Sequence, residues 1–232
     1  MKRLDFWVGG AAGLALVYAS WGGWAPFGMT EALGFVTGAL CVYLVVRENV
    51  WNFPVGIANN VFFLALFAGV RLYGDAALQI IYIALGFQGW YLWLRGGENR
   101  TPLRVERASR RLLAGVAAFV VAGTAALTLL FRHVNDSAPF LDAFTTALSL
   151  GAQYLLNRKA VENWWLWIAA DVVYVYLYAA RGLRLTAVLY LVFLCLCVAG
   201  LRSWLGTMSA RGREAEGGRA PVLGARGGAA RG

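Results

Sequence analysis

One stretch of the sequence places aromatic and acidic side chains at intervals of three or four residues, the spacing that brings them to one face of a helix. The five residues of this aromatic stripe are Trp164, Trp167, Asp171, Tyr174 and Tyr178. Indole and phenol rings can stack on a planar ligand, and the carboxylate adds one negative charge. The stripe therefore predicts a binding face for a small molecule that contains a ring.

Neutral amide side chains in neighbouring apolar segments accompany the stripe: Gln153, Asn157, Asn163, Asn60 and Gln88. Amides can satisfy a carboxamide or the hydroxyls of a sugar. An anionic ligand would require arginines at this depth, and a metal ion would require clustered carboxylates or histidines, neither of which the sequence offers there. We therefore predict a substrate-binding site with no metal ion and no cofactor, formed by Trp164, Trp167, Asp171, Gln153, Asn157, Asn60, Asn163, Tyr174 and Gln88.

The composition predicts that these residues lie inside a membrane. Of the 232 residues 60% are hydrophobic, 28 are glycines and only 14% are charged, against about 25% charged in a typical soluble domain. Because a soluble fold lacks the polar surface to cover this much apolar surface, a water-soluble enzyme and a nucleic-acid-binding domain are both disfavoured, despite the net charge of +9. No phosphate-binding glycine loop, nucleophile elbow or HExxH motif supports an enzymatic activity.

Eight apolar segments are long enough to cross a bilayer, which requires about 20 residues each. They cover 6–24, 29–46, 51–69, 75–95, 112–131, 139–156, 163–180 and 184–205. With eight spans both termini share one face, and that face collects 17 of the 21 Lys and Arg residues. Because basic residues stay on the cytoplasmic side, we expect an all-α, multi-pass membrane protein with both termini in the cytoplasm.

An internal repeat relates the two halves of the chain. A shift of 111 residues aligns 42–94 with 153–205 without a gap, and 17 of the 53 pairs are identical, Trp93 with Trp204 among them. If a single helix links two three-helix units, both units begin on the same side of the membrane and therefore have the same orientation in it. Such parallel repeats occur in transporters, whose substrate site lies near the membrane midplane where the repeats meet.

The predicted organisation is one helix followed by three, one and three. An extra N-terminal helix occupies 1–28, the two repeats occupy 29–95 and 139–205, a basic cytoplasmic loop and linker helix occupy 96–138, and a tail occupies 206–232. We expect the loop to lie against anionic lipid headgroups and the tail to be disordered. Tryptophans near the ends of spans are expected to be interfacial anchors, namely Trp7, Trp21, Trp24, Trp90, Trp93 and Trp204.

These residues resemble the PnuC family of bacterial nicotinamide riboside transporters over nearly the whole chain. The matching motifs are Gln153-Tyr154, Asn157-Arg158-Lys159, Glu162-Asn163-Trp164-Trp165-Leu166-Trp167, Asp171, Tyr178, Gly182-Leu183 and Thr186-Ala187-Val188-Leu189-Tyr190 in the second half, and Trp51-Asn52-Phe53-Pro54, Gly56, Asn59-Asn60 and Leu72-Tyr73-Gly74-Asp75 in the first. The Trp-x-x-Trp pair, here Trp164 and Trp167, looks like the one that is associated with holding the nicotinamide ring. The resemblance implies a 3+1+3 core similar to that of the SWEET sugar transporters, to which helix 6–24 is an addition.

For function, the resemblance implies uptake of nicotinamide riboside, a precursor of NAD, across the bacterial inner membrane by facilitated diffusion, with trapping by cytoplasmic phosphorylation. Related members carry thiamine or riboflavin, so these vitamins are alternative substrates, and Asp171 leaves proton coupling as an alternative mechanism. A membrane scaffold that transports nothing is the third alternative. The expected partners are the small-molecule substrate and membrane lipids, with no nucleic acid, and the sequence leaves the oligomeric state open, a homo-oligomer included.

Overall fold

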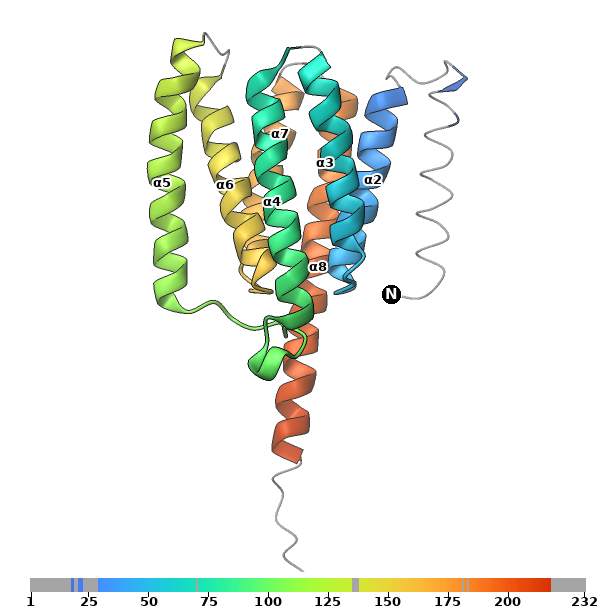
Figure 1. Ribbon diagram of the computed structural model, residues 1–232, viewed down its shortest axis with the longest axis vertical. Coiled ribbons are helices and arrows are strands. Elements are labelled where there is room, and N and C mark those ends of the chain that lie inside the picture. The colour runs from blue at the N-terminus through green and yellow to red at the C-terminus, as the bar shows by residue number, and fades with distance from the viewer. Residues whose placement is uncertain are drawn as a thin grey trace, which may run out of the picture.

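The computed structural model describes residues 18, 21–22, 29–69, 71–134, 138–180, 182 and 184–217, so most of the expected first span lies outside the described residues. Seven α-helices occupy the described part of the chain: α2 (Met29–Val46), α3 (Asn52–Gly69), α4 (Tyr73–Arg95), α5 (Arg110–His133), α6 (Pro139–Asn157), α7 (Asn163–Ala180) and α8 (Arg184–Gly217), with a short 3-10 helix η1 (Glu98–Arg100) after α4. They stand side by side as a bundle (Figure 1). Apart from the end of α8, their bounds agree with the predicted spans to within two residues.

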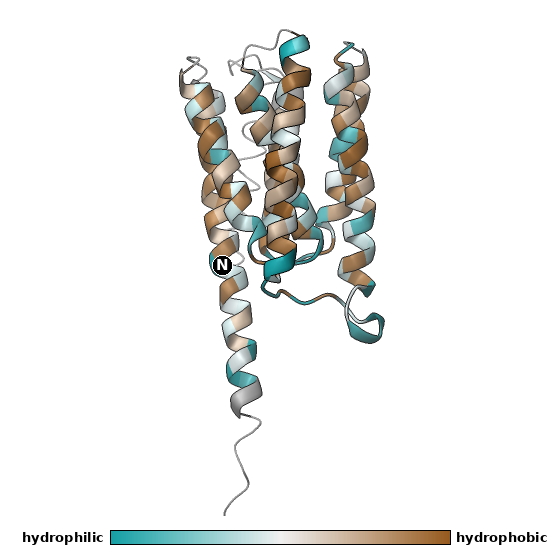
Figure 2. Cartoon of the chain, turned by 90° about the vertical axis from the view of Figure 1, so that its left-hand side faces the viewer, coloured by the Kyte–Doolittle hydropathy of each residue, from teal (hydrophilic) through white to brown (hydrophobic). Residues whose placement is uncertain are grey.

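By length and composition, four of the described helices can cross a membrane: α3, α4, α5 and the Thr186–Glu214 part of α8. In α2, Ala32–Val46 forms a shorter apolar helix. The helices α6 and α7 have a lower mean hydropathy than these four, because they contain the predicted amides, Asp171 and three tryptophans. Hydrophobic residues dominate the bundle, and hydrophilic residues gather in the connections and in the projecting end of α8 (Figure 2).

Six of the helices form a closed ring, and α5 lies outside it. In the first half of the chain α3 packs against both α2 and α4, and in the second half α7 packs against both α6 and α8. The two halves meet where α4 packs against α6 and α2 packs against α8. Helix α5 packs against α6 at the edge of the bundle (Figure 1).

Two tryptophans at repeat-equivalent positions join the halves by exchanged hydrogen bonds. The Trp93 indole Nε1 donates to the Leu156 carbonyl oxygen at 3.1 Å, and the Trp204 indole Nε1 donates to the Val45 carbonyl oxygen at 3.1 Å. Donors and acceptors alike are related by the shift of 111 residues. The interpretation of Trp93 and Trp204 as interfacial anchors is wrong, because they are 3% and 0% exposed and their N–H groups bond across the ring.

The aromatic packing beside these hydrogen bonds follows the same relation. Phe53 meets Trp93 edge to face, with ring centroids 5.1 Å apart and an interplanar angle of 88°. Trp164 meets Trp204 in the same manner at 5.3 Å and 82°. Edge-to-face pairs of this kind stabilise a fold by about 0.5–1.5 kcal/mol beyond the area that they bury. The two halves therefore hold each other through matched contacts.

We expect Trp93→Phe and Trp204→Phe to lower stability by similar amounts. Each variant keeps an aromatic ring but loses one buried indole hydrogen bond, at a net cost of about 0.5–1.5 kcal/mol. Both acceptor carbonyl oxygens keep a second donor, because each also accepts a hydrogen bond from a backbone N–H three residues further along the chain. Trp165→Phe is the matched control, because Trp165 is 58% exposed. Thermal unfolding of the purified protein in detergent measures the effect. If Trp165→Phe lowers the melting temperature as much as the other two variants do, the two indole hydrogen bonds do not stabilise the fold in this way.

The basic loop between α4 and α5 packs against the connection between α6 and α7. The Glu106 backbone N–H donates to the Lys159 carbonyl oxygen at 3.2 Å, and the Val161 backbone N–H donates to the Glu106 carbonyl oxygen at 2.9 Å. Val105 beside them is only 3% exposed. This differs from the predicted position against lipid headgroups, because the loop contains an apolar side chain that is buried in the protein core.

Helix α8 continues well beyond the predicted end of its span and projects below the bundle (Figure 1). Leu205 and Met208 pack against the main hydrophobic cluster, and the Ser209 hydroxyl donates to the Leu205 carbonyl oxygen at 3.0 Å. The prediction of a disordered tail is therefore wrong for 206–217, because apolar contacts extend the helix. Residues 218–232 lie outside the described part of the chain.

Candidate functional site

The ring of helices encloses a cavity of about 360 Å³. Small-molecule sites in proteins commonly measure roughly 300–1,000 Å³. Each of the six ring helices contributes lining residues, and the outer helix α5 contributes none. The cavity therefore lies between the two repeats, where a site shared by both is expected in transporters built from repeats.

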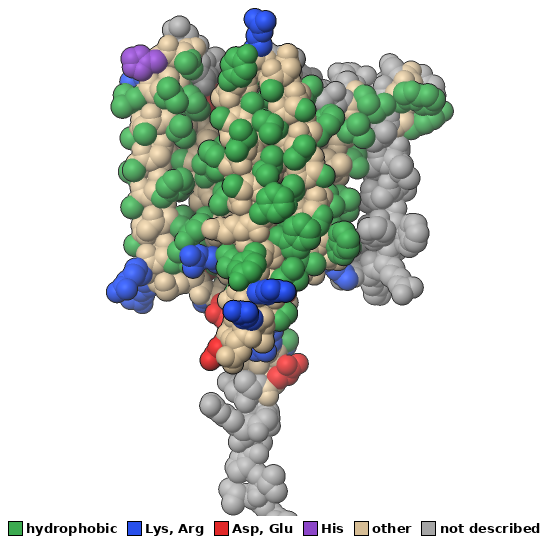
Figure 3. All heavy atoms as spheres, in the orientation of Figure 1, with side chains coloured by type: hydrophobic (Ala, Val, Ile, Leu, Met, Phe, Trp, Pro, Cys, Tyr) green, Lys and Arg blue, Asp and Glu red, His purple; other side chains and the backbone are tan. Residues whose placement is uncertain are grey.

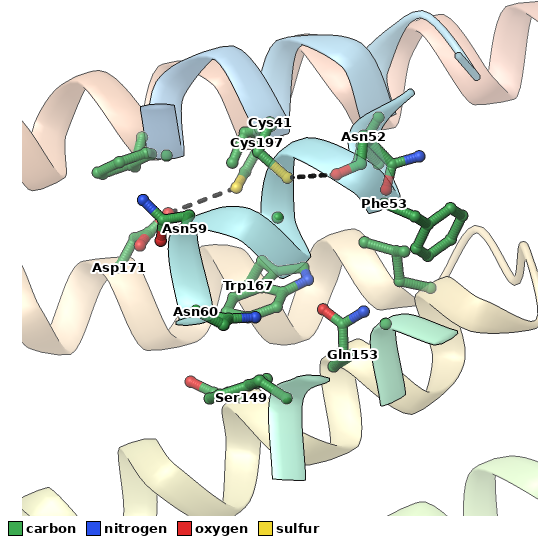
Figure 4. A pocket seen from close by; sticks show the side chains of 18 of the residues that line it. Cys41, Asn52, Phe53, Asn59, Asn60, Ser149, Gln153, Trp167, Asp171 and Cys197 are labelled. Carbon is green, nitrogen blue, oxygen red and sulfur yellow. Dashed lines mark hydrogen bonds between the residues drawn. The ribbon is translucent and has the colours of Figure 1, made fainter. Parts of the chain in front are cut away.

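Six of the nine predicted binding residues line this cavity. They are Asn60 from α3, Gln153 from α6, and Trp164, Trp167, Asp171 and Tyr174 from α7. Figure 4 shows Asn60, Gln153, Trp167 and Asp171 around one space, although they come from three helices. The three-and-four spacing along α7 thus brings both tryptophans, the carboxylate and one phenol to the same cavity.

Asn157 and Gln88, two of the other three predicted residues, lie behind the cavity wall. Asn157 is 0% exposed, and its Nδ2 donates to the Leu85 carbonyl oxygen at 2.7 Å and to Gln88 Oε1 at 3.2 Å. Its Oδ1 accepts a hydrogen bond from Gln153 Nε2 at 3.0 Å. Asn157 therefore ties α6 to α4 and fixes the orientation of the Gln153 side chain, which does line the cavity.

Asn163, the third, supports the start of α7. It is 0% exposed, and its Nδ2 donates to the Ala160 carbonyl oxygen at 2.7 Å. The repeat-equivalent Asn52 donates to the Asn49 carbonyl oxygen at 2.8 Å in the same way. The matching amides at the starts of α3 and α7 thus have a structural role, and the Asn163 side chain does not line the cavity.

Several lining residues were not predicted as binding residues, and the spacing of some could have revealed them. Ser149 lies four residues before Gln153 and so shares its face of α6. Tyr190 and Cys197 lie seven residues apart on one face of α8, which the sequence does not distinguish from an ordinary apolar span. The other unpredicted polar lining residues are Cys41, Asn52, Asn59 and Tyr82.

Aromatic rings form much of the wall of the cavity between α7 and α8. The centroids of Tyr174 and Tyr190 are 4.7 Å apart, and Tyr190 lies 6.0 Å from Phe193. Trp164 is only 1% exposed, yet its indole Nε1 has no hydrogen-bond partner among the described residues. Because a buried indole N–H usually has an acceptor, a ligand carbonyl or hydroxyl group could complete this site.

Asp171 is the only residue with a formal charge among the described residues that line the cavity. Its side chain is 6% exposed, and the Cys197 thiol donates to its Oδ2 at 3.4 Å (Figure 4). In the part of the chain that the structure describes, no group of three or more His, Cys, Asp or Glu residues could hold a metal ion. The described part of the cavity wall therefore combines aromatic rings and neutral amides with one acidic side chain.

An ion pair links the two halves next to the Trp93–Trp204 contact. Lys159 Nζ lies 3.3 Å from Glu48 Oε2 and 4.4 Å from the centroid of the Trp93 ring. Glu48 and Lys159 are repeat-equivalent, and both adopt positive φ angles, 53° and 50°, two residues after the ends of α2 and α6. Burial lowers the pKa of the Lys159 ammonium group from its ordinary value, and the Glu48 carboxylate opposes that shift.

This end of the bundle is also the basic end. Figure 3 shows Lys and Arg side chains gathered where α8 projects, with hydrophobic side chains along the helices above them. Between the cavity and the ion pair lies a layer of buried aromatic rings: Phe53, Trp93, Trp164 and Trp204. These four rings therefore separate the cavity from the Glu48–Lys159 ion pair.

Comparisons with known proteins agree on one family. Residues 28–206 match the family model described as "Nicotinamide mononucleotide transporter". The nicotinamide riboside transporter PnuC of Escherichia coli (strain K12) is 26% identical over 211 residues, which is 80% of this chain and 88% of that protein. The riboflavin/roseoflavin transporter RibM of Streptomyces davaonensis is 28% identical over 179 residues, which is 75% of this chain and 84% of that protein.

A solved structure shares the fold. The crystal structure of the vitamin B3 transporter PnuC superimposes with a TM-score of 0.67 at 23% sequence identity, covering 90% of this chain and 94% of that one. The resemblance stated from the motifs is thereby confirmed. A family match over most of the chain, apolar helices long enough to span a bilayer and the same fold lead to one conclusion: the chain belongs to the nicotinamide mononucleotide transporter family and is a multi-pass membrane protein.

Proposed function

We propose that this protein carries nicotinamide riboside across the bacterial inner membrane by facilitated diffusion. The observation that supports this best is the position of Trp164 and Trp167 in one cavity with the amides of Gln153 and Asn60. A nicotinamide ring can stack on an indole, and its carboxamide and ribose hydroxyls can pair with the amides and with the unpartnered indole N–H of Trp164. The relatives from Escherichia coli and Neisseria mucosa are named nicotinamide riboside transporters.

A screen of thermal stability against three vitamins tests which ligand the cavity takes. We expect nicotinamide riboside to raise the melting temperature of the purified protein more than thiamine or riboflavin does, since a ligand stabilises the folded state that it binds. Riboflavin is the alternative that deserves a direct comparison, because the relative from Streptomyces davaonensis is named a riboflavin transporter. A response to riboflavin alone would change the substrate, and no response to any of the three would refute the proposal.

For mechanism, we propose that the two three-helix units rock about the cavity, as in a SWEET-like 3+1+3 carrier. In this account both termini and the basic end are cytoplasmic, in line with the positions of the Lys and Arg side chains (Figure 3). The layer of aromatic rings and the Glu48–Lys159 ion pair then form a cytoplasmic gate, which has to open for release. Phosphorylation of the released nucleoside by a cytoplasmic kinase would keep it in the cell.

Cross-linking across this gate is expected to stop transport but not binding. In a variant with Glu48→Cys and Lys159→Cys on a background with the native cysteines replaced by serine, a short thiol cross-linker should lower uptake at least about tenfold, because the opening step is blocked. Uptake into proteoliposomes, measured before and after a cleavable linker is reduced, gives the result. The Lys159→Cys single variant, treated in the same way, is the control. Wild-type uptake by the cross-linked protein would contradict the gate.

A proton-coupled carrier of the same fold is the second candidate. It is favoured by the burial of Asp171 in the cavity wall, since acidic residues inside membranes commonly serve as proton sites. It predicts that a pH step drives accumulation of the substrate in proteoliposomes above the outside concentration, and that Asp171→Asn abolishes this accumulation. Facilitated diffusion predicts that uptake stops at equal concentrations on the two sides, whatever the pH step.

A further inference from the structure

We infer that Asp171 selects a ligand with a positive charge, so that the cavity prefers a cationic aromatic nucleoside to a neutral one of the same shape. This inference rests on the proposed function and names the chemical feature by which the site would recognise its substrate. It follows from the lone charge in the cavity, from the repeat, and from the aromatic rings around the carboxylate.

Among the residues that the structure describes, the Asp171 carboxylate has no cationic partner in the cavity wall. Of the described residues that line this space, none is Lys, Arg or His, and the hydrogen bond from the Cys197 thiol at 3.4 Å comes from a weak, neutral donor. The Asp171 side chain is 6% exposed. Because a buried charge is costly unless it is paired, a positive charge on the ligand would stabilise the ionised form of this carboxylate.

The internal repeat places an uncharged amide at the position equivalent to Asp171. The residue equivalent to Asp171 under the shift of 111 is Asn60, which also lines the cavity. Asn and Asp have nearly the same shape, so the two sides of the site differ here by a charge rather than by volume. The pseudo-symmetric helices therefore form an asymmetric cavity, with a neutral amide on α3 and an acidic group on α7.

The rings that surround Asp171 suit a flat cation. Trp167 precedes it by four residues and Tyr174 follows it by three, so all three share one face of α7. Tyr190 from α8 packs on Tyr174 with centroids 4.7 Å apart. Aromatic faces attract cations, and this attraction grows when water is excluded. A ligand with its charge delocalised over a planar ring can therefore stack on the rings and pair with the carboxylate.

A pair of nearly identical ligands separates charge from shape. Nicotinamide riboside has a pyridinium ring with a fixed positive charge, whereas its 1,4-dihydro form has the same ribose and carboxamide and is neutral. Binding of both to the wild-type protein, to Asp171→Asn and to Asn60→Ala can be measured by isothermal titration calorimetry in detergent. Asn60→Ala is the matched control, because it removes an uncharged polar group from the equivalent position of the same cavity.

The wild-type protein is expected to bind the cationic form at least about tenfold more tightly than the dihydro form, because a desolvated charge pair changes affinity strongly. Asp171→Asn should weaken the cationic form by a similar factor and leave the dihydro form nearly unchanged. Asp171→Glu should keep the preference for the cation. Asn60→Ala should weaken both forms by the same factor.

Equal losses for the two ligands in Asp171→Asn would overturn the inference, since they would mean that Asp171 only accepts a hydrogen bond from the sugar. Equal affinities of the wild-type protein for the two forms would also overturn it, since a proton would then neutralise the carboxylate. In either case the wild-type protein would still bind nicotinamide riboside, so the proposed transport function would stand although the charge selection would not. A wild-type protein that binds neither form would refute the proposed function and the charge selection together.

Discussion

Trp167→Ala is expected to weaken binding of nicotinamide riboside by about 30- to 1,000-fold, as the loss of a central tryptophan does in other binding sites, and to abolish uptake. The side chain lines the cavity, is partly buried, and packs at its edge against the main hydrophobic cluster. A fixed indole offers a large flat surface to the nicotinamide ring, and alanine leaves a space that the ligand cannot fill. Calorimetry is the suitable measurement, because it does not depend on tryptophan fluorescence.

Trp165→Ala provides the control for this prediction. Trp165 is in the same turn of α7, but it is 58% exposed and does not line the cavity. Its replacement should leave the affinity within about twofold of the wild-type value, since exposed side chains away from a site contribute little. Retention of wild-type affinity by Trp167→Ala, or an equal loss in both variants, would show that the ring does not bind on Trp167.

The second large effect is expected from Gly200→Ala. A Cβ atom at this position of α8 would overlap the ring of Trp164, which lies against the glycine and cannot move away, because it is 1% exposed and packs on Trp204. Overpacking of this kind lowers stability by about 1–3 kcal/mol. Because Trp164 also lines the cavity, the same change should weaken ligand binding.

Gly206→Ala on the same helix should have the opposite effect on stability. A Cβ atom at Gly206 meets nothing within 4 Å, so alanine adds helix propensity of about 1 kcal/mol without a clash. Melting temperatures of the two variants in detergent, together with calorimetric titration of the ligand, measure both effects. A Gly200→Ala protein as stable as Gly206→Ala would contradict the close packing of α8 on Trp164.

The local parts of this structure were predictable from the sequence. Apolar runs of suitable length predict all seven described helices, since each run must form its backbone hydrogen bonds within itself. The spacing of Trp164, Trp167, Asp171 and Tyr174 correctly predicts a shared face of α7, because the period of the helix depends only on its backbone. The shift of 111 residues likewise relates the matched contacts of Trp93 and Trp204.

The roles of individual residues depend on contacts between distant segments, which spacing does not reveal. The hydrogen bonds of Trp93 and Trp204 reach across 63 and 159 residues, so both tryptophans resemble interfacial anchors until the helices are packed. Asn157 is a plausible ligand contact by its position on α6, yet its amide bonds to α4 from behind the cavity wall. The extension of α8 was missed because Leu205 and Met208 pack against a cluster assembled from several helices.

Uptake of labelled nicotinamide riboside into proteoliposomes without any imposed gradient measures facilitated diffusion by this protein. If the cavity between the repeats serves facilitated diffusion, the wild-type protein should let the label equilibrate until the inside and outside concentrations are equal, and Trp167→Ala should admit no more label than empty liposomes do. Trp165→Ala should equilibrate as the wild type does. If wild-type proteoliposomes take up no more label than empty ones, the protein does not carry nicotinamide riboside by facilitated diffusion.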